Sequence, residues 1–399
     1  MKYGNVYVVC AMDTEGPIVN PKKPDILQNW SQVNKLIKYL SSKKFRYTVK
    51  DSSNKGLIYS WFLLTLTGFK TNPFRRPMKY HEVYDHYTKK FGKNFKKYKD
   101  GIYWHYHQPA LSGIGNEWTT DWTSSQEYFN ILSRLISERS YYPSCFRAGG
   151  RIENNDTSNW LEEWIPFDYS NCSGNVNWYN KESDGKFLID LVDWSKAPKK
   201  WSGYKPSKTN YQKKGNLNRY IFRSPDLNSN VHQIKLKDIE AAFKQAQKGR
   251  NACLSFFEHD RRFKTIENIL NLMIMIKKIS KKYNKIKWFY KNAVDAANLS
   301  LNIKNYKKPK FSVSLKKENR IEITVKGDMF NRTPFLCYKI KNKIQEIPLN
   351  VLGLNKWVTA PFEKSKINKM RLSVGGCSPC GVANVQHFKY KTRNFINYK

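Results

Sequence analysis

The sequence has no apolar run long enough to span a membrane, and residues 61–66, the best candidate, are few and interrupted by threonine. No signal-peptide pattern, with an apolar segment and a small-residue cleavage site, precedes the first expected strand. The seven cysteines are an odd number at irregular spacing, which is not typical of a disulfide framework. These absences predict a cytoplasmic protein without a membrane span.

Acidic residues are scarce, since 32 Asp and Glu against 71 Lys and Arg give a formal net charge of +39. A charge of this size favours nucleic acid or an acidic glycan as a partner. The lysine pairs, however, are scattered from Lys22-Lys23 to Lys316-Lys317, and asparagine is also abundant. We therefore attribute the charge to a general enrichment in these residues. No specific nucleic-acid binding is expected, only a mild attraction of anionic substrates.

The chain is long enough, at 399 residues, for one large and one small domain, and 40% hydrophobic residues provide a sizeable core. The best linker is the basic, proline-containing segment 304–310. This predicts domains at residues 1–303 and 304–399. The second domain contains short alternating apolar runs near residues 311–315 and 321–325, which predict a small all-β sandwich.

Two carboxylates follow the first apolar stretch, Tyr-Val-Val-Cys-Ala-Met at residues 7–12. Asp13 and Glu15 come next, before a Gly-Pro break. The pattern predicts a strand buried on both faces, with an exit turn at Gly16. Because side chains two apart on a strand point the same way, both carboxylates are expected to enter one shared space. They would repel each other there unless a cation or a proton lies between them.

A second stretch has the same design, with aromatic residues leading to His105 and His107 before Pro109. Two histidines at this spacing share one face of a strand, and imidazole is the commonest transition-metal ligand. Two histidines and one carboxylate leave coordination positions open for water and substrate. The sequence therefore predicts a metal site formed by His105, His107 and one carboxylate.

Two later strands also end in chemically active residues. One ends at Arg147, which is followed by two glycines and could orient a carboxylate, although an ordinary surface arginine fits as well. The other ends at His259 and Asp260, candidates for proton transfer and substrate contact. Trp118, in a glycine-bearing loop, is a candidate for stacking on a sugar ring. Strands alternating with helices predict a parallel barrel with its site at the carboxyl ends of the strands.

In this order, these motifs resemble those of the polysaccharide deacetylase superfamily, which includes chitooligosaccharide and peptidoglycan deacetylases. Asp13-Thr14-Glu15 is similar to the first motif, and Arg147-Ala148-Gly149 to the third. Phe257-Glu258-His259 is similar to the last motif. The second motif usually has two histidines four apart, whereas His105-Tyr106-His107-Gln108-Pro109 resembles the H-x-H-P form of a divergent branch. The resemblance covers about residues 5–298.

The resemblance implies a distorted barrel with fewer than eight strands. It also implies metal-dependent removal of an N- or O-acetyl group from a carbohydrate, in surface polysaccharide metabolism. Asp13 would be the general base, held ionised by Arg147, and His259 would be the proton donor. Glu15 with the two histidines would hold a divalent metal, zinc first, with cobalt, iron or manganese as alternatives. The partner is then a carbohydrate or polysaccharide, while the sugar and the oligomeric state stay open.

Two other functions fit the same residues. A glycoside hydrolase could use a barrel with Asp13 and a second carboxylate on either side of a glycosidic bond. A catalytically inactive binding protein could use the +39 charge to hold an anionic glycan or a nucleic acid. Metal dependence distinguishes the first from a deacetylase, and the absence of turnover distinguishes the second.

Overall fold

In a computed structural model the described residues are 2–20, 25–66, 70–108, 127–172, 193–228, 233–391 and 394–398. They form two compact units, and the chain enters the second unit three times. The first unit consists of Met1–Trp122, Cys145–Ser158 and Phe167–Ile303, and the second of Thr123–Ser144, Asn159–Pro166 and Lys304–Lys399.

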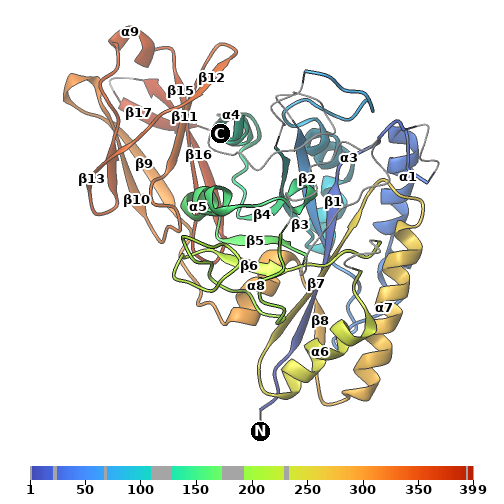
Figure 1. The fold of residues 1–399 in the computed structure, drawn as a ribbon. Coiled ribbons are helices and arrows are strands. Elements are labelled where there is room, and N and C mark those ends of the chain that lie inside the picture. The colour runs from blue at the N-terminus through green and yellow to red at the C-terminus, as the bar shows by residue number, and fades with distance from the viewer. Residues whose placement is uncertain are drawn as a thin grey trace. The chain divides into compact units, whose positions relative to one another are not determined.

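The first unit is a nearly closed barrel of seven parallel strands in the order β6-β5-β4-β3-β2-β1-β7 (Figure 1). The strands are β1 Val6–Thr14, β2 Tyr59–Leu66, β3 Gly101–His107, β4 Cys145–Ala148, β5 Phe167–Asn171, β6 Tyr220–Arg223 and β7 Ala252–His259; the short β8, Trp288–Tyr290, pairs with the start of β1. The segment after β6 meets β7 where Leu227 N donates to Phe257 O. The expected barrel architecture is thereby confirmed.

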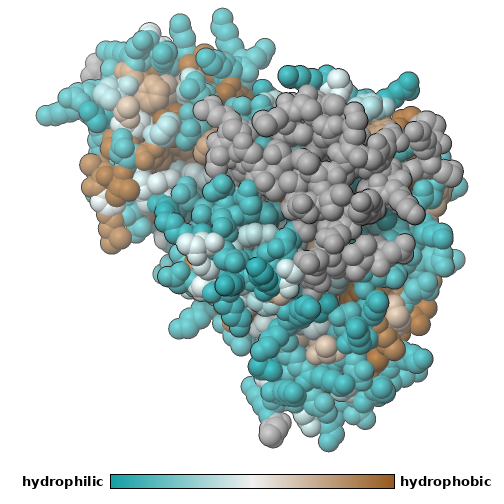
Figure 2. Space-filling model, in the orientation of Figure 1, coloured by the Kyte–Doolittle hydropathy of each residue, from teal (hydrophilic) through white to brown (hydrophobic). Residues whose placement is uncertain are grey.

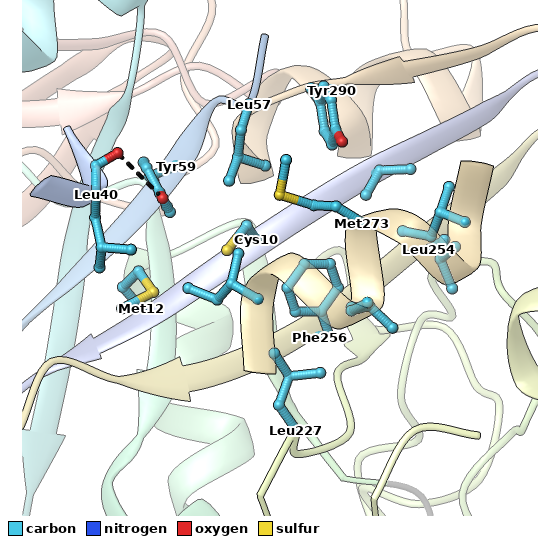
Figure 3. Packing of buried hydrophobic residues seen from close by; sticks show 14 of the residues in the cluster. Cys10, Met12, Leu40, Leu57, Tyr59, Leu227, Leu254, Phe256, Met273 and Tyr290 are labelled. Atoms are coloured by element: carbon cyan, nitrogen blue, oxygen red, sulfur yellow. Dashed lines mark hydrogen bonds between the residues drawn. The ribbon is translucent and has the colours of Figure 1, made fainter. Parts of the chain in front are cut away.

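Helices cover the outside of this sheet. They are α1 Trp30–Leu40, α2 Lys43–Arg46, α3 Glu82–Tyr98, α6 Leu236–Gln247 and α7 Thr265–Lys282. The chain also contains α5 Asn155–Trp164, a 3₁₀ turn η1 at Gly149–Arg151, and α8 Ala293–Leu301, whose alanine side chains pack with Val9 and Ala11 of β1. Apolar side chains of α1, α3, α6 and α7 pack with one face of the strands in the largest core, part of which is shown in Figure 3. There Met273 of α7 lies close to Cys10 and Phe256 of the strands.

Alternate residues of each strand face the helices or the barrel interior. On β1, Val8, Cys10 and Met12 belong to the core under the helices, whereas Val9 and Ala11 belong to a separate core inside the barrel. The interior core also includes Tyr103 of β3, Cys145 of β4, and Cys253 and Phe257 of β7. Beyond these residues, every second position at the strand ends lies on the same interior face. These positions are Asp13, Glu15, His105, His107, Arg147 and His259. We call this set the interior row.

The second unit contains two antiparallel sheets, β13-β14-β10-β9 and β12-β11-β15-β16-β17, which share one apolar core. The strands are β9 Lys310–Leu315, β10 Ile321–Lys326, β11 Phe335–Ile340, β12 Lys343–Glu346, β13 Asn350–Gly353, β14 Lys356–Val358, β15 Arg371–Cys377, β16 Ala383–Lys391 and β17 Asn394–Tyr398, with a 3₁₀ turn η2 at Lys317–Asn319 and α9 at Lys364–Ile367. The antiparallel β-sheets expected after the barrel are therefore present.

The second unit also includes α4, Glu127–Arg139, and the end of α5, both of which the expected boundary at residue 304 assigned to the first domain. The α4 helix bonds to strand β11, since Lys339 lies 2.8 Å from Glu138 and the thiol of Cys337 donates to Ser133 O. Asn331 Nδ2 donates to Trp164 O at 2.8 Å, which ties the end of α5 to the same unit.

The surface shown in Figure 2 is mainly hydrophilic, with small apolar areas. Among the described residues, no helix combines the length and the apolar character needed to cross a membrane. All seven cysteines are buried and free, as their odd number and irregular spacing suggested. Two of them, Cys377 and Cys380, lie at a tight turn in which Gly381 N donates to Ser378 O.

One buried ion pair joins α2 to the start of strand β3. Both oxygens of Asp100 accept from the guanidinium of Arg46, at 2.7 and 2.6 Å, and neither side chain is exposed. Asp100 also accepts from Tyr59 N at 3.0 Å and from Trp61 Nε1 at 2.9 Å. One carboxylate therefore holds α2, β2 and β3 in register at the amino-terminal end of the barrel.

Replacing this carboxylate, Asp100→Ala, is expected to lower the free energy of unfolding by about 3–5 kcal/mol, because Arg46 is left as an uncompensated buried charge. Urea unfolding followed by circular dichroism measures the change. The matched control is Glu240→Ala, which removes a partly exposed carboxylate that contacts Lys244 and Lys282 and should change the stability far less. Equal losses in the two variants would contradict this account.

Candidate metal centre

Three side chains of the interior row converge where β1 and β3 end. Glu15 Oε1 lies 3.9 Å from His105 Nε2 and 3.7 Å from His107 Nε2, and the two imidazole nitrogens are 3.1 Å apart. All three residues are buried. They form the group of potential metal ligands that the described residues provide. The structure thus brings together the three residues that the motif resemblance implied as ligands.

The rings of both histidines are held in place by the end of strand β4. His105 Nδ1 lies 2.9 Å from the carbonyl oxygen of Arg147, which can only accept, so Nδ1 carries a proton and Nε2 is the nitrogen directed at Glu15. The ring of His107 packs against Gly149, where a Cβ atom would collide with the imidazole. Burial lowers the pKa of His107 to about 3, so its ring is neutral at pH 7 and suited to binding a cation.

The spacing of these three atoms suits a single cation. Ligand atoms at tetrahedral angles around zinc, each about 2.1 Å from the metal, are separated by about 3.4 Å. The observed separations of 3.1, 3.7 and 3.9 Å lie on both sides of that value. Glu15, His105 and His107 could therefore hold a metal ion. With only three protein ligands, a tetrahedral ion would keep a position open for water or substrate.

The other carboxylate oxygen of Glu15 is occupied by two arginines. Arg76 Nη2 donates to Oε2, and Arg261 Nε lies 3.2 Å from the same atom. Burial alone would raise the pKa of Glu15, but Arg261, Arg76 and the histidines lower it well below its usual range. Glu15 is thus ionised, with one oxygen bound to guanidinium groups and the other facing the imidazoles.

Asp13 and Arg147 form a second buried pair in the interior row. Arg147 Nε donates to Asp13 Oδ1 at 2.6 Å, and its Nη1 donates to the carbonyl oxygen of Tyr169. The guanidinium carbon lies 3.7 Å from the ring centroid of Phe257. Arg147 is fully buried and Asp13 is 3% exposed. The structure therefore brings Arg147 to Asp13, as the third motif implied.

Asp260 is fully buried, and its carboxylate holds the end of β1. Its oxygens accept from the backbone N–H groups of Glu15 and Gly16, at 3.0 and 2.9 Å, and from the hydroxyl of Tyr87 at 2.5 Å. Gly16 has a φ of +73°, and the ring of Trp30 leaves no room there for a side chain. Substrate contact by Asp260 stays a prediction, whereas its observed bonds fix the position of Glu15.

His259 also approaches Glu15, with its Nε2 3.5 Å from Oε1, the oxygen that faces the other two imidazoles. Burial and the cationic Arg261 and Arg262 lower the pKa of His259 well below its usual value, so its resting form is neutral. Trp118, the expected sugar-stacking residue, lies outside the described residues.

The sequence did not identify Arg76, Arg261 or Tyr87 as residues of the site. Arg261 directly follows His259 and Asp260 at the end of β7. Polar residues that follow an apolar strand were the signal for the other site residues, and the same signal could have identified Arg261. Arg76 lies in a basic and aromatic segment that has many similar residues, and nothing local distinguishes it. Tyr87 lies on an amphipathic helix as one aromatic core residue among several.

No model of a known protein family matches this chain. No curated protein matches its sequence either. The site therefore has to be interpreted from its own geometry and from the motif resemblance.

A further buried carboxylate, Glu258, lies beside the site on the outward face of β7. It accepts from His259 N and from Asn268 Nδ2 of α7, both at 2.8 Å, and is fully buried. Burial raises its pKa from 4.5 to about 7, and nearby Asp226 adds to the shift. The folded protein therefore binds this proton more tightly than the unfolded chain does.

The Glu258→Gln variant is expected to lose this proton linkage. In the wild type, Glu258 stabilises the fold fully below pH 4.5, and that contribution disappears as the pH rises towards 7. The stability of Glu258→Gln relative to wild type should therefore increase by about 3 kcal/mol between pH 4.5 and 7.5. Chemical unfolding over this pH range measures the difference. If the free energy of unfolding of the two proteins changed equally with pH, the raised pKa of Glu258 would be contradicted.

Removing one imidazole should abolish metal binding. The His105→Ala and His107→Ala variants are each expected to weaken binding of zinc by more than about 100-fold, the upper range for changes outside the ligand shell. Isothermal titration with ZnCl₂, and metal content after dialysis, measure the loss. The matched control is His86→Ala, because His86 stacks on Trp30 at 3.8 Å in α3 and takes no part in the site. Unchanged zinc affinity in both site variants would refute the site.

Proposed function

We propose that this protein is a metal-dependent hydrolase that removes an N- or O-acetyl group from a carbohydrate. The observation that carries the proposal is the pairing of two features in one interior row. A buried Glu15-His105-His107 group could hold a cation, and a carboxylate next to it, Asp13, is fixed by Arg147. The carbohydrate class, the barrel type and the choice of zinc rest on the motif resemblance.

The metal ligands fit the chemistry of acyl hydrolysis. A zinc ion bound by Glu15, His105 and His107 would polarise the acyl carbonyl and lower the pKa of a bound water. The histidines are neutral ligands, and the single carboxylate is already bound to arginines at its second oxygen. The site would thus keep most of the positive charge of the ion, which favours polarisation of the carbonyl.

Asp13 is the proposed general base. Arg147 holds the carboxylate by Nε and is itself fixed by Tyr169 O and the Phe257 ring, so Asp13 has one orientation in a buried setting. A carboxylate held in one orientation is positioned to accept a proton from water.

His259 is the proposed donor of the proton to the leaving amine or alcohol. Its resting form is neutral because burial and two arginines disfavour the imidazolium. Negative charge that develops on the substrate beside its ring offsets these cations and favours protonation. His259 would therefore take up a proton from solvent as this charge develops and pass it to the leaving group, while Asp13 returns the proton that it took from water to solvent.

The Asp13→Asn variant is expected to lose acetate release by at least about 10²-fold while keeping its metal content, since it removes the base and leaves every proposed ligand in place. Acetate release from acetylated chitooligosaccharides and O-acetylated xylan, measured by an enzyme-coupled assay, gives the activity.

The control compares wild type before and after chelation with EDTA and after return of zinc. Loss and recovery of acetate release support a metal-dependent hydrolase. Full acetate release after chelation would refute the metal dependence, and cleavage of the glycosidic bond without acetate release would favour a glycosidase. An Asp13→Asn variant that keeps full activity would refute the role of Asp13.

A further inference from the structure

A pocket of about 500 Å³ lies at the amino-terminal end of the barrel, at the opposite end of β7 from the metal centre. It is lined by the carboxyl-terminal half of α6, by the segment before Ser202 and by Arg250, which precedes β7; α6 and the amino terminus lie at the bottom of Figure 1. The lining residues are Lys199, Lys200, Trp201, Ala241, Lys244, Gln245, Lys248 and Arg250. The eight residues of β7 separate this pocket from His259 by roughly 25 Å.

Five of the eight lining residues are cations, and none is acidic. Lys244 has one carboxylate nearby, Glu240, at 3.8 Å. In the part of the chain that the structure describes, Lys199, Lys200, Lys248 and Arg250 have no ion-pair partner. Cations that surround one concave space repel each other and raise the local positive potential. This concentration differs from the scattered lysine pairs that account for the overall charge.

The floor of the pocket is held rigidly by one side chain. Gln245 Nε2 donates to Trp201 O at 3.0 Å, to Ser202 Oγ at 2.9 Å and to Asn251 O at 2.8 Å. Trp201 is 1% exposed, and its Nε1 donates to Asp238 O at 2.7 Å. The three segments that carry the cations are therefore fixed relative to one another, and only the ends of the lysine side chains remain adjustable.

We propose that this pocket binds a small molecule with a diphosphate or triphosphate group. Its volume lies within the range of small-ligand pockets, about 300–1,000 Å³, and is too small for a nucleic-acid duplex. Lysine ammonium groups bind phosphate as point charges, and Arg250 adds the possibility of a two-point contact. A group with three or four negative charges matches the four cations that lack a partner. The phosphates could come from inorganic triphosphate or from a nucleotide.

The test uses the full chain and compares two triple variants with equal charge. One removes pocket cations, Lys199→Gln, Lys200→Gln and Lys248→Gln. The other removes Lys35, Lys38 and Lys44, which are exposed on and next to α1 and α2 and do not line the pocket. Isothermal titration in 150 mM NaCl measures binding of inorganic triphosphate, ATP, inorganic phosphate and a short single-stranded DNA.

The proposal expects micromolar binding of triphosphate by the wild type, at least a tenfold loss in the pocket variant and less than a twofold loss in the control variant. Tighter binding of ATP than of inorganic triphosphate identifies a nucleotide as the source, and the reverse identifies the inorganic ion. Equal losses in the two variants, absence of triphosphate binding, or binding of DNA alone would each overturn the proposal. None of these outcomes depends on the metal centre.

Discussion

A single buried carboxylate, Glu15, organises the candidate metal centre. One of its oxygens faces three imidazoles, from His105, His107 and His259, and the other is bound by two guanidinium groups. A carboxylate in such a setting stays ionised only because these cations offset the cost of burial. The backbone of Glu15 is fixed in turn by Asp260. Strand ends that are far apart in the sequence thus meet around one negative charge.

The period of two along each strand explains why these ends meet. In β1, β3, β4 and β7 the residues that fill the barrel interior are odd-numbered, and each row continues past the apolar core into a polar residue. Parallel strands deliver all these residues to the same end of the barrel. The site is therefore a continuation of the interior core, which explains why its charged groups are almost fully buried.

This regularity determines what could be predicted. Asp13, Glu15, His105, His107 and His259 were accessible from the sequence because they follow apolar runs at a spacing of two. Arg76 and Tyr87 were not, because they reach the site from a loop and a helix whose local pattern contains many similar residues. The assignment of α4 to the second unit also escaped prediction, since its apolar face is equally compatible with a barrel helix.

The second unit combines chain segments that are synthesised at well-separated times. The α4 helix buries Ile131, Leu132 and Ile136 in that unit, and its bonded partner Cys337 lies 204 residues further along the chain from Ser133. At about 5–20 residues per second, the ribosome needs about 10–40 s to make that stretch. During this interval the apolar face of α4 has no native partner strand. The nascent chain is therefore a natural client for chaperones that shield exposed hydrophobic helices.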